Sequence, residues 1–599
     1  MAWTPEQQKA IDTRDRTLLV SAAAGSGKTA TLTERIIRSI LDEENPMDIG
    51  RMLIATYTNA AVDELRERIG KAIKEAAIAN PENLRLEEQL LKLKDAKILT
   101  ITAFCNTILR SSAESIGLAP NYRIAEPAEA KILSSSVLEA LINAAYDGEI
   151  PEVCSAEDFI AMADCISNVK HSEGLSEAIS LIFEKLTYSE LGIDTLVPLI
   201  EEYKPESFDT VEKSRMGAFI IDELKAALSA YKEAYEKFIP LATDDRQDVS
   251  NLKKAESDLT LINNLLSESS YDKIRSILDS AEFENLSRSG KDGPTEFHLS
   301  LKFFRPLFIE DIRKFCNEYF FYSTKEWQEL YTNLYKLLGI LYKFLKKYDE
   351  VFTNEKRSRS ICEFSDVERY AYNALYNPDG TVTDLAKELS DKFDAIYVDE
   401  YQDVNSLQGR IFAAIAKENN RFMVGDIKQS IYGFRSARPE IFLDMKNRFP
   451  LIGSDGDYPA ASIFMSNNFR CDRTVVDFVN GIFDTMFSTF GKSIGYVDDD
   501  KLKFSKIYKE NDTPVGITPE IHIIEKPPRI AQAAPEDAAE EMLEEEKNKN
   551  KLEAEHIARK IASLLECGRL ASGKSVEPRD IAVLMRSVKS ELASELTNA

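Results

Sequence analysis

The chain has 599 residues, of which 44% are hydrophobic and 29% are charged, as is usual for a globular protein. One hydrophobic core serves at most about 250–300 residues, so we expect several domains. No stretch approaches the roughly 20 apolar residues of a membrane helix, and the N-terminus lacks the basic and apolar regions of a signal peptide. These features predict no membrane association and a cytoplasmic location.

The formal net charge is −26, from 75 basic and 101 acidic residues. A nucleic-acid binder usually carries a basic surface, so the total charge by itself argues against one. A channel for a single strand, however, needs only a local stripe of positive charge with stacking aromatic rings. The seven cysteines and four histidines are scattered without a C-x-x-C pair, which disfavours a structural zinc site or a disulfide framework.

The first 125 residues alternate short apolar runs with amphipathic stretches. We predict strands at 17–20, 52–57 and 98–101, and helices at 29–41 and from about residue 59. Short apolar strands that alternate with helices indicate a parallel sheet covered on both faces. We therefore predict an α/β fold whose first part spans residues 1–125.

The composition changes at about residue 126, where strand-like runs become rare. Leu, Glu, Lys, Ser and Ala dominate residues 126–370, which predicts a mainly helical domain inserted into the α/β domain. Buried-strand patterns at 393–398 and 422–424 then indicate that the first sheet resumes in residues 371–463.

A second α/β region is expected over residues 464–599. Its acidic segment at 536–546 predicts a solvated helix or a connector. The amphipathic pattern at 553–565 predicts a helix, and the apolar run at 580–584 predicts a strand.

The loop after the first predicted strand has the composition of a phosphate-binding loop. Its glycines allow the backbone to wrap around phosphate oxygens, while the lysine reaches the β- and γ-phosphates and the threonine hydroxyl binds Mg²⁺. The pattern's first glycine is replaced by alanine, and a plain small-residue turn is the alternative reading. The loop comprises Ala22, Ala23, Ala24, Gly25, Ser26, Gly27, Lys28 and Thr29.

A pair of carboxylates follows the predicted strand that ends at Val398. Asp399 is placed to bind the metal of a triphosphate, and Glu400 to polarise the attacking water as general base. An acidic turn that merely solubilises a strand end is the alternative for an isolated pair. Gln402 and Asp403 follow at once, and they favour the catalytic interpretation.

The segment Asp399-Glu400-Tyr401-Gln402-Asp403 resembles motif II of the UvrD/RecB-type superfamily 1 helicases, D-E-x-Q-D. Other motifs of that family occur in the expected order, although the usual histidine of motif Ib is absent. The matching segments are Gln7 for the adenine-reading glutamine, 56–61 for motif Ia, 102–105 for motif Ib, 424–435 for motif III and 467–470 for motif IV.

The resemblance implies a RecA-like P-loop motor domain with a long, mainly helical insertion, followed by the start of a second RecA-like domain. Within the family the chain resembles AddA, the helicase–nuclease subunit of the bacterial AddAB complex. The W-T-x-x-Q start, the long interval between Phe104 and Asp399, and the segment 580–587 carry this resemblance.

The resemblance also implies a route from ATP to DNA. Gln429 would contact the γ-phosphate, and nearby aromatic rings would stack on the bases of single-stranded DNA without reading their sequence. Arg435 could grip DNA or pair with a carboxylate near ATP, and the residues do not decide between these roles. The implied DNA contacts are Tyr57, Thr58, Asn59, Phe104, Tyr432, Phe434 and Arg435.

Two residues of motif IV complete the implied ATP site. Arg470 resembles the arginine that the second motor domain inserts at the γ-phosphate, and Phe469 would stack on adenine. The implied catalytic set is thus Lys28, Asp399, Glu400, Gln429 and Arg470. The implied cofactors are ATP and Mg²⁺, with the metal held by Thr29 and Asp399.

We therefore expect an ATP-hydrolysing DNA helicase that translocates 3′ to 5′, engages single-stranded and duplex-end DNA, and pairs with an AddB-type subunit in double-strand break repair. Motifs V and VI and the nuclease residues of AddA find no match in the 599 residues, so we expect nucleotide binding with poor turnover and no processive unwinding. The alternatives are a stand-alone UvrD-like helicase and a non-enzymatic repair scaffold with a degenerate motor fold.

Overall fold

A computed structural model describes the chain except for residues 1–2, 113–116, 120, 167–173, 206–208, 288–292, 434–435, 455, 457, 491–495, 506–518, 525–537, 571–572 and 589. The chain forms two compact units, one of residues 1–107 with 372–599 and the other of residues 108–371. The domain boundaries expected from the sequence, at 125/126, 370/371 and 463/464, remain predictions.

The first unit is built on a six-stranded parallel sheet with the order β3-β2-β6-β7-β1-β8. The predicted α/β class with a parallel central sheet is therefore confirmed. Residue 464 lies within the last strand of this sheet. The strands are β1 (Thr17–Ala22), β2 (Met52–Thr56), β3 (Lys97–Thr100), β6 (Ala395–Val398), β7 (Arg421–Gly425) and β8 (Ala460–Met465).

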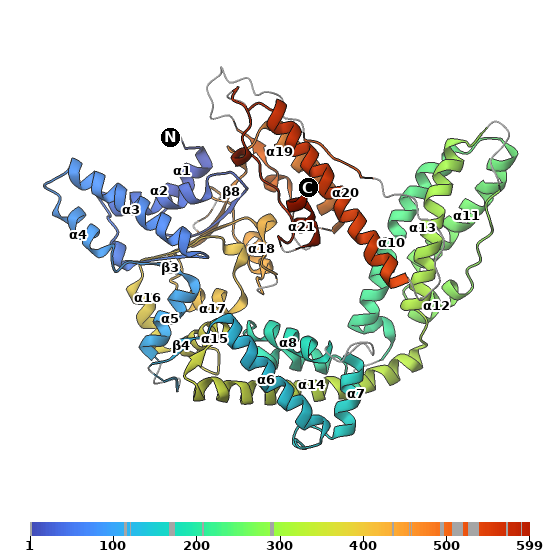
Figure 1. Cartoon of the computed structure of the whole chain (residues 1–599), viewed down its shortest axis with the longest axis horizontal. Helices are drawn as coiled ribbons and strands as arrows, with labels where there is room; N and C mark the ends of the chain where they lie inside the picture. Colours follow the sequence, from blue (N-terminus) through green and yellow to red (C-terminus); the bar gives the residue numbers. More distant parts are fainter. Residues whose placement is uncertain are drawn as a thin grey trace. The chain divides into compact units, whose positions relative to one another are not determined.

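Both faces of this sheet are covered. Alternate strand residues such as Leu18 and Ile54 pack with Leu32 and Ile36 of α2, while the intervening Leu19 is also fully buried. In Figure 1 the blue helices α1 to α4 lie beside the strands. The helices of this part are α1 (Pro5–Asp12), α2 (Lys28–Leu41), α3 (Asn59–Ala79), α4 (Leu84–Lys92), α16 (Asp384–Lys392), α17 (Ser406–Ala414) and α18 (Pro439–Arg448).

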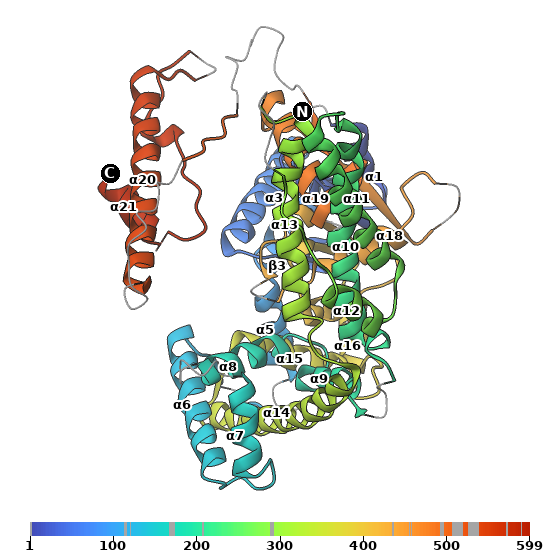
Figure 2. The same ribbon diagram turned by 90° about the vertical axis from the view of Figure 1, so that its right-hand side faces the viewer.

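The residues after β8 add a small parallel ladder of β9 (Asn467–Asn468) with β10 (Lys503–Phe504) and helix α19 (Arg473–Phe490). Helices α20 (Ala538–Cys567) and α21 (Glu591–Asn598) lie side by side (Figure 2). Residues 538–546 of the acidic segment and the whole amphipathic segment, which the sequence predicts as separate elements, thus belong to one helix, α20; residues 536–537 lie outside the described residues.

The strand predicted at 580–584 is wrong. Residues Pro578–Asp580 form a 3-10 turn, and residues 581–584 join no ladder of the described chain. A strand must pair its backbone groups with a neighbour and pack its side chains, yet Leu584 is 95% exposed. The apolar pattern alone was therefore not sufficient to predict a strand.

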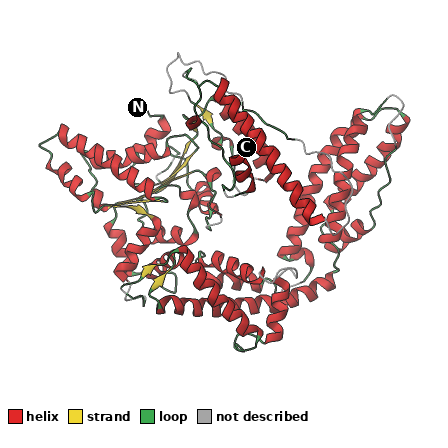
Figure 3. Ribbon diagram, in the orientation of Figure 1, coloured by secondary structure: helices red, strands yellow, loops and turns green. Residues whose placement is uncertain are grey.

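The second unit is mainly helical, as the red ribbon of Figure 3 shows, with one short ladder between β4 (Arg123–Ile124) and β5 (Ile361–Cys362) among its described residues. Helices α5 (Ile101–Ser112) and α15 (Phe364–Leu375) contain its two boundaries. The others are α6 (Pro127–Tyr146), α7 (Ala156–Ile166), α8 (Gly174–Thr187), α9 (Leu196–Glu201), α10 (Arg215–Phe238), α11 (Arg246–Ser267), α12 (Tyr271–Asp279), α13 (Glu296–Glu318) and α14 (Thr324–Ser358).

Two hydrophobic cores stabilise this helical unit, and the 35-residue helix α14 contributes to both. Its Tyr331 packs among helices α10 to α13, whereas its Phe344 and Phe352 pack against α6, α7 and α8. Across the described residues, no helix is both long and apolar enough to cross a membrane.

Candidate functional site

The loop that joins β1 to α2 has the backbone conformation of an anion cradle. Gly25 and Gly27 have φ values of +72° and +82°, in the left-handed region that favours glycine. Ala22, which replaces the first glycine of the pattern, is the last residue of β1 and pairs with Met465. Its extended backbone does not require glycine, which explains why alanine is tolerated there.

Gly25 has no room for a side chain. A Cβ atom at this position would lie 2.8 Å from Asn468 Nδ2 and 3.0 Å from Arg470 Cβ. The left-handed backbone adds a strain of about 1–2 kcal/mol for a residue with a Cβ. We therefore expect Gly25→Ala to weaken nucleotide affinity by about tenfold, measured by titration with a fluorescent ADP analogue.

The matched control is Gly339→Ala, because a Cβ added to Gly339 within α14 would meet no atom within 4 Å. This variant should leave the affinity unchanged. Equal affinity of Gly25→Ala and the unaltered chain would show that the loop does not hold the nucleotide.

Lys28 is paired with Glu400, which lies 372 positions further along the chain. Lys28 Nζ donates to Glu400 Oε2 at 3.0 Å, and the lysine side chain is only 11% exposed. The strand order β6-β7-β1 places the carboxyl ends of these strands along one edge of the sheet. The loop and the two carboxylates therefore meet, as the sequence interpretation required.

Glu400 has an unusual backbone conformation for a glutamate, with φ 50° and ψ 45°. This left-handed conformation costs about 1–2 kcal/mol for a residue other than glycine. Its carboxylate accepts from Gln402 Nε2 at 2.9 Å, and its backbone N–H donates to Asp399 Oδ1 at 2.9 Å. Strain of this kind is often found at functional sites, where surrounding contacts maintain it.

Asp399 lies directly after β6 and is buried. Burial raises the pKa of its carboxyl group to about 6, and the negative charge of Glu400 acts in the same direction, against the opposite effects of the Glu400 backbone N–H and Lys28. The pKa of Asp403 is also raised, first by burial and then by Glu400. A buried carboxylate in this state favours a cation as its partner.

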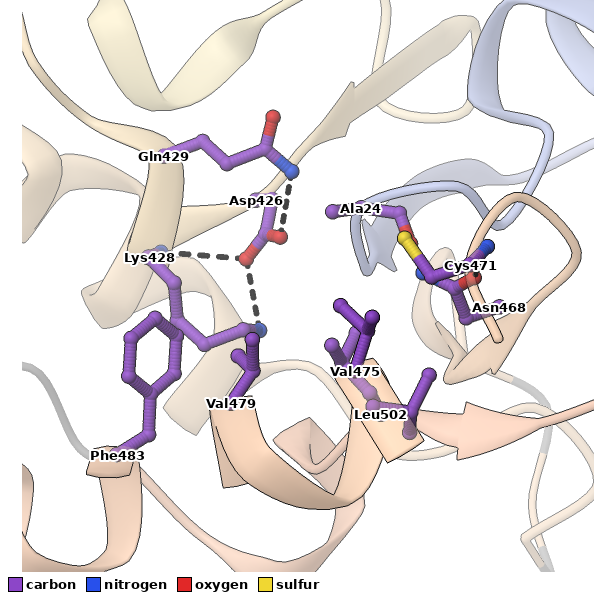
Figure 4. A pocket seen from close by; sticks show the side chains of 11 residues that line it. Ala24, Asp426, Lys428, Gln429, Asn468, Cys471, Val475, Val479, Phe483 and Leu502 are labelled. Carbon is purple, nitrogen blue, oxygen red and sulfur yellow. Dashed lines mark hydrogen bonds and ion pairs between the residues drawn. The ribbon is translucent and has the colours of Figure 1, made fainter. Parts of the chain in front are cut away.

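A hydrogen-bond relay links this pair to the end of β7. Gln402 Oε1 accepts from the Asp426 backbone N–H at 2.9 Å, while its Nε2 bonds Glu400. Asp426 in turn accepts from Gln429 Nε2 and from Lys428 Nζ, both at 2.8 Å (Figure 4). Gln429 is thus held through Asp426 and Gln402 to the carboxylate that pairs with Lys28.

A cavity of about 180 Å³ adjoins this relay. Figure 4 shows Asp426, Lys428 and Gln429 on one side of it and Ala24, Asn468 and Cys471 on the other. Apolar side chains of α19 and Leu502 line the remainder. The predicted residue Gln429 therefore lies at the rim of an apolar hollow next to the loop.

Asn468 attaches the segment after β8 to the glycine loop. Its Nδ2 donates to Ala24 O at 2.8 Å, and the Phe469 backbone N–H donates to Gly25 O at 3.0 Å. Asn468 Oδ1 also accepts from the Arg470 backbone N–H at 2.9 Å. The Arg470 guanidinium is exposed and has no ion pair within the described residues.

Gln7 lies on the other side of the loop. It forms a capping box with Thr4 at the start of α1, and its Nε2 donates to Ser26 O at 2.8 Å. A Cβ added to Gly27 would lie 3.0 Å from that same Nε2. The buried guanidinium of Arg35 holds α1 in place by donating to Ala10 O at 2.7 Å.

Part of the expected DNA-binding set forms a surface group. The rings of Tyr57 and Tyr432 are stacked, with centroids 6.1 Å apart and planes 10° apart. The Tyr57 hydroxyl donates to the Asp403 carbonyl. Thr58 caps α3, whose first residue is Asn59, and both are exposed.

Phe104 requires a correction. Its side chain is only 2% exposed and makes an edge contact with Phe393, with ring centroids 6.1 Å apart. A ring enclosed in the core has no free face for a base, so Phe104 is not a DNA contact. Phe434 and Arg435 lie outside the described residues.

The sequence interpretation assigned no role to three residues that connect the site, namely Gln402, Asp426 and Asn468. Each lies within a recognised motif and is at most 1% exposed. A buried polar side chain is usually hydrogen-bonded. The position of these polar residues directly after apolar strands was therefore the sequence signal that could have identified them.

The glycine loop between β1 and α2 and the strand order define a P-loop α/β domain. The family model described as the UvrD/REP helicase N-terminal domain matches residues 3–450. The chain belongs to this family, which confirms the resemblance inferred from the motifs.

Proteins named as the A subunit of an ATP-dependent helicase/nuclease are similar to most of the chain. The protein of Acetivibrio thermocellus is 32% identical over 98% of this chain and 49% of its own length. That of Thermoanaerobacter pseudethanolicus is 33% identical over 88% and 43%, and that of Clostridium novyi 33% over 98% and 48%. The chain thus spans about half the length of these relatives.

Proposed function

We propose that this chain is the ATP-driven motor portion of a DNA helicase–nuclease. The observation that carries the proposal is the 3.0 Å contact of Lys28 with Glu400. It brings a loop lysine and the carboxylate of a residue with a strained backbone together at one edge of a parallel sheet. The relatives are named for an ATP-dependent helicase/nuclease, which supports the same activity.

The residues fit a magnesium nucleotide. The glycine loop has no room for added Cβ atoms, and Lys28 is the one cation that offsets the charge of buried Asp399 among the described residues. Thr29 and Asp399 would hold Mg²⁺, which supplies positive charge to the phosphate oxygens when bound. Lys28 would leave Glu400 to bind the phosphates, and Glu400 would then accept a proton from the attacking water.

In this proposal Arg470 and Gln429 report on the γ-phosphate. The exposed Arg470 guanidinium extends from the segment that Asn468 fixes to the loop. Gln429 would exchange its bond with Asp426 for a phosphate oxygen, which alters the relay through Gln402. Phe469 and Gln7 would contact the adenine.

The stacked pair of Tyr57 and Tyr432 would bind single-stranded DNA. Stacking of one base on an aromatic side chain contributes about 1–3 kcal/mol and tolerates any sequence. Tyr432 is three residues from Gln429. A movement of Gln429 when the γ-phosphate is lost would therefore be transmitted to the Tyr432 ring through only a few residues.

By family resemblance the whole protein would move 3′ to 5′, process double-strand breaks in the cytoplasm and work with an AddB-type partner. A stand-alone UvrD-like helicase is the alternative motor, and the nuclease named in the relatives argues against it. A scaffold without enzymatic activity would not need the Lys28–Glu400 pair or the strained Glu400 backbone.

The test is ATP hydrolysis of the chain with and without oligothymidylate. We expect DNA to raise turnover, and Tyr432→Ala to reduce that stimulation with little effect on the rate without DNA. Tyr458→Ala is the matched control, since Tyr458 is 43% exposed and comes just before β8, beside the start of β1 and at the end of the strand away from the glycine loop. Equal rates of the unaltered chain and Lys28→Ala would instead support the scaffold.

A pH dependence follows from the raised pKa of Asp399, about 6. Below pH 6 the carboxyl is protonated and is a poor ligand for Mg²⁺. The affinity for Mg²⁺–ADP should therefore fall between pH 7.5 and pH 5.5, measured by calorimetry. The Asp399→Asn variant serves as the control, because its pH profile contains only the titration of the nucleotide and of other groups. If the unaltered chain and Asp399→Asn had the same pH profile, Asp399 would not be the metal ligand.

A further inference from the structure

A second cavity, with a polar lining, lies at the opposite end of the strands that carry the site. Its volume is about 240 Å³. Most of its lining residues precede or begin β1, β6 and β7, and the others are Arg35 of α2, Met47 and Tyr397 of β6. The four residues of β6 separate this end from Asp399 by roughly 13 Å. The cavity is therefore distinct from the glycine loop.

Basic side chains dominate the polar lining of this cavity. Asp15 and Asp394 are the acidic ones, and Asp394 is paired with Arg51 at 2.6 Å and, more weakly, with Lys417 at 3.7 Å. In a chain with a net charge of −26 such a local excess of cations is unusual. The basic lining residues are Arg14, Arg16, Arg35, Lys417 and Arg421.

Two of these guanidinium groups have buried donors without an acceptor among the described residues. These donors are the Nε atoms of Arg35 and Arg421. Arg35 is only 6% exposed, and its other contacts include Ala10 O and the Phe422 ring. A buried donor without a partner costs free energy that a bound acceptor recovers.

Burial and a neighbouring positive charge both disfavour the charged form of Arg35. Burial lowers the pKa of Arg35 to about 10, nearby Tyr397 opposes that shift, and the positive charge of Arg14 lowers the pKa further. An anion bound in the cavity would stabilise the buried charge of Arg35 and reduce the repulsion between Arg35 and Arg14.

We propose that this cavity is a binding site for a small phosphate-class anion. Guanidinium groups present paired N–H donors that match phosphate oxygens. The volume lies below the roughly 300–1,000 Å³ of sites for drug-sized ligands, which suits inorganic phosphate or pyrophosphate. The phosphate could also belong to DNA, so the experiment distinguishes the two sources.

The test uses calorimetric titration of the full chain with sodium pyrophosphate. All variants carry Lys28→Ala, which removes the phosphate contact of the glycine loop. In this background we expect one pyrophosphate site, and the further pair Arg14→Gln and Lys417→Gln should weaken it at least tenfold. Both residues are only partly buried, so thermal melting should confirm that this variant remains folded.

The matched control is Arg68→Gln with Lys71→Gln, which removes two positive charges from exposed side chains of α3. It should leave pyrophosphate affinity unchanged. Competition by oligothymidylate in the Lys28→Ala background would assign the site to DNA phosphate, and its absence to a free anion. No binding in this background, or equal loss in both double variants, would overturn the proposal.

Discussion

Replacement of Lys28 by alanine should greatly reduce ATP turnover and weaken nucleotide binding. The Lys28 ammonium contacts Glu400 at 3.0 Å and offsets part of the charge of Asp399, and its side chain is 11% exposed. Loss of one preorganised charge at a reacting phosphate reduces turnover by about 10²–10³-fold. The measurement is phosphate release under saturating ATP, together with the affinity for a fluorescent ADP analogue.

Lys71→Ala is the appropriate control for this variant, because it removes the same charge from a lysine whose side chain is 76% exposed on α3. It should keep the turnover of the unaltered chain. Retained hydrolysis in Lys28→Ala would show that the phosphates bind elsewhere.

Replacement of Glu400 by glutamine should separate binding from hydrolysis. The amide preserves the side-chain volume but cannot accept a proton from water, so turnover should fall by roughly 10²–10⁴-fold. ATP affinity should be maintained or increased. In the unaltered chain Lys28 must break its ion pair with Glu400 to bind the phosphates, and in the variant this ion pair is absent. The expected result is a large fall in kcat with an equal or smaller Kd for ATP.

Glu388→Gln provides the matched change, since Glu388 is exposed on α16. Both binding and turnover should then equal those of the unaltered chain. A parallel loss of ATP binding and turnover in Glu400→Gln would indicate a structural role for Glu400 in place of the proposed general base.

The sequence predicted most of the sheet and the centre of the site because both depend on local patterns. Buried strands read as continuous apolar runs, and β1, β2, β6 and β7 lie within a few residues of the predicted positions. The glycine loop and Asp399 also follow directly after their strands. A parallel sheet then brings the carboxyl ends of its strands to one edge.

The remaining features depend on contacts that no local pattern contains. Phe104 belongs to a motif that contacts DNA in the family, yet its ring is buried and packs edge-on against Phe393. The apolar run at 580–584 lacks a described neighbour strand to pair with. Gln429 bonds Asp426, and Asn468 bonds Ala24, through side chains whose partners no motif specifies. The sequence therefore identified Gln429 as a site residue but gave no role to Asp426 or Asn468.

A crystal structure of the chain with Mg²⁺ and a non-hydrolysable ATP analogue would test the central claim most directly. We expect the Lys28 ammonium to contact the β- and γ-phosphates, with Mg²⁺ near Thr29 and Asp399 and Glu400 released toward a water beside the γ-phosphate. Nucleotide bound away from the loop at 22–29, with the 3.0 Å contact between Lys28 and Glu400 still closed, would contradict the account.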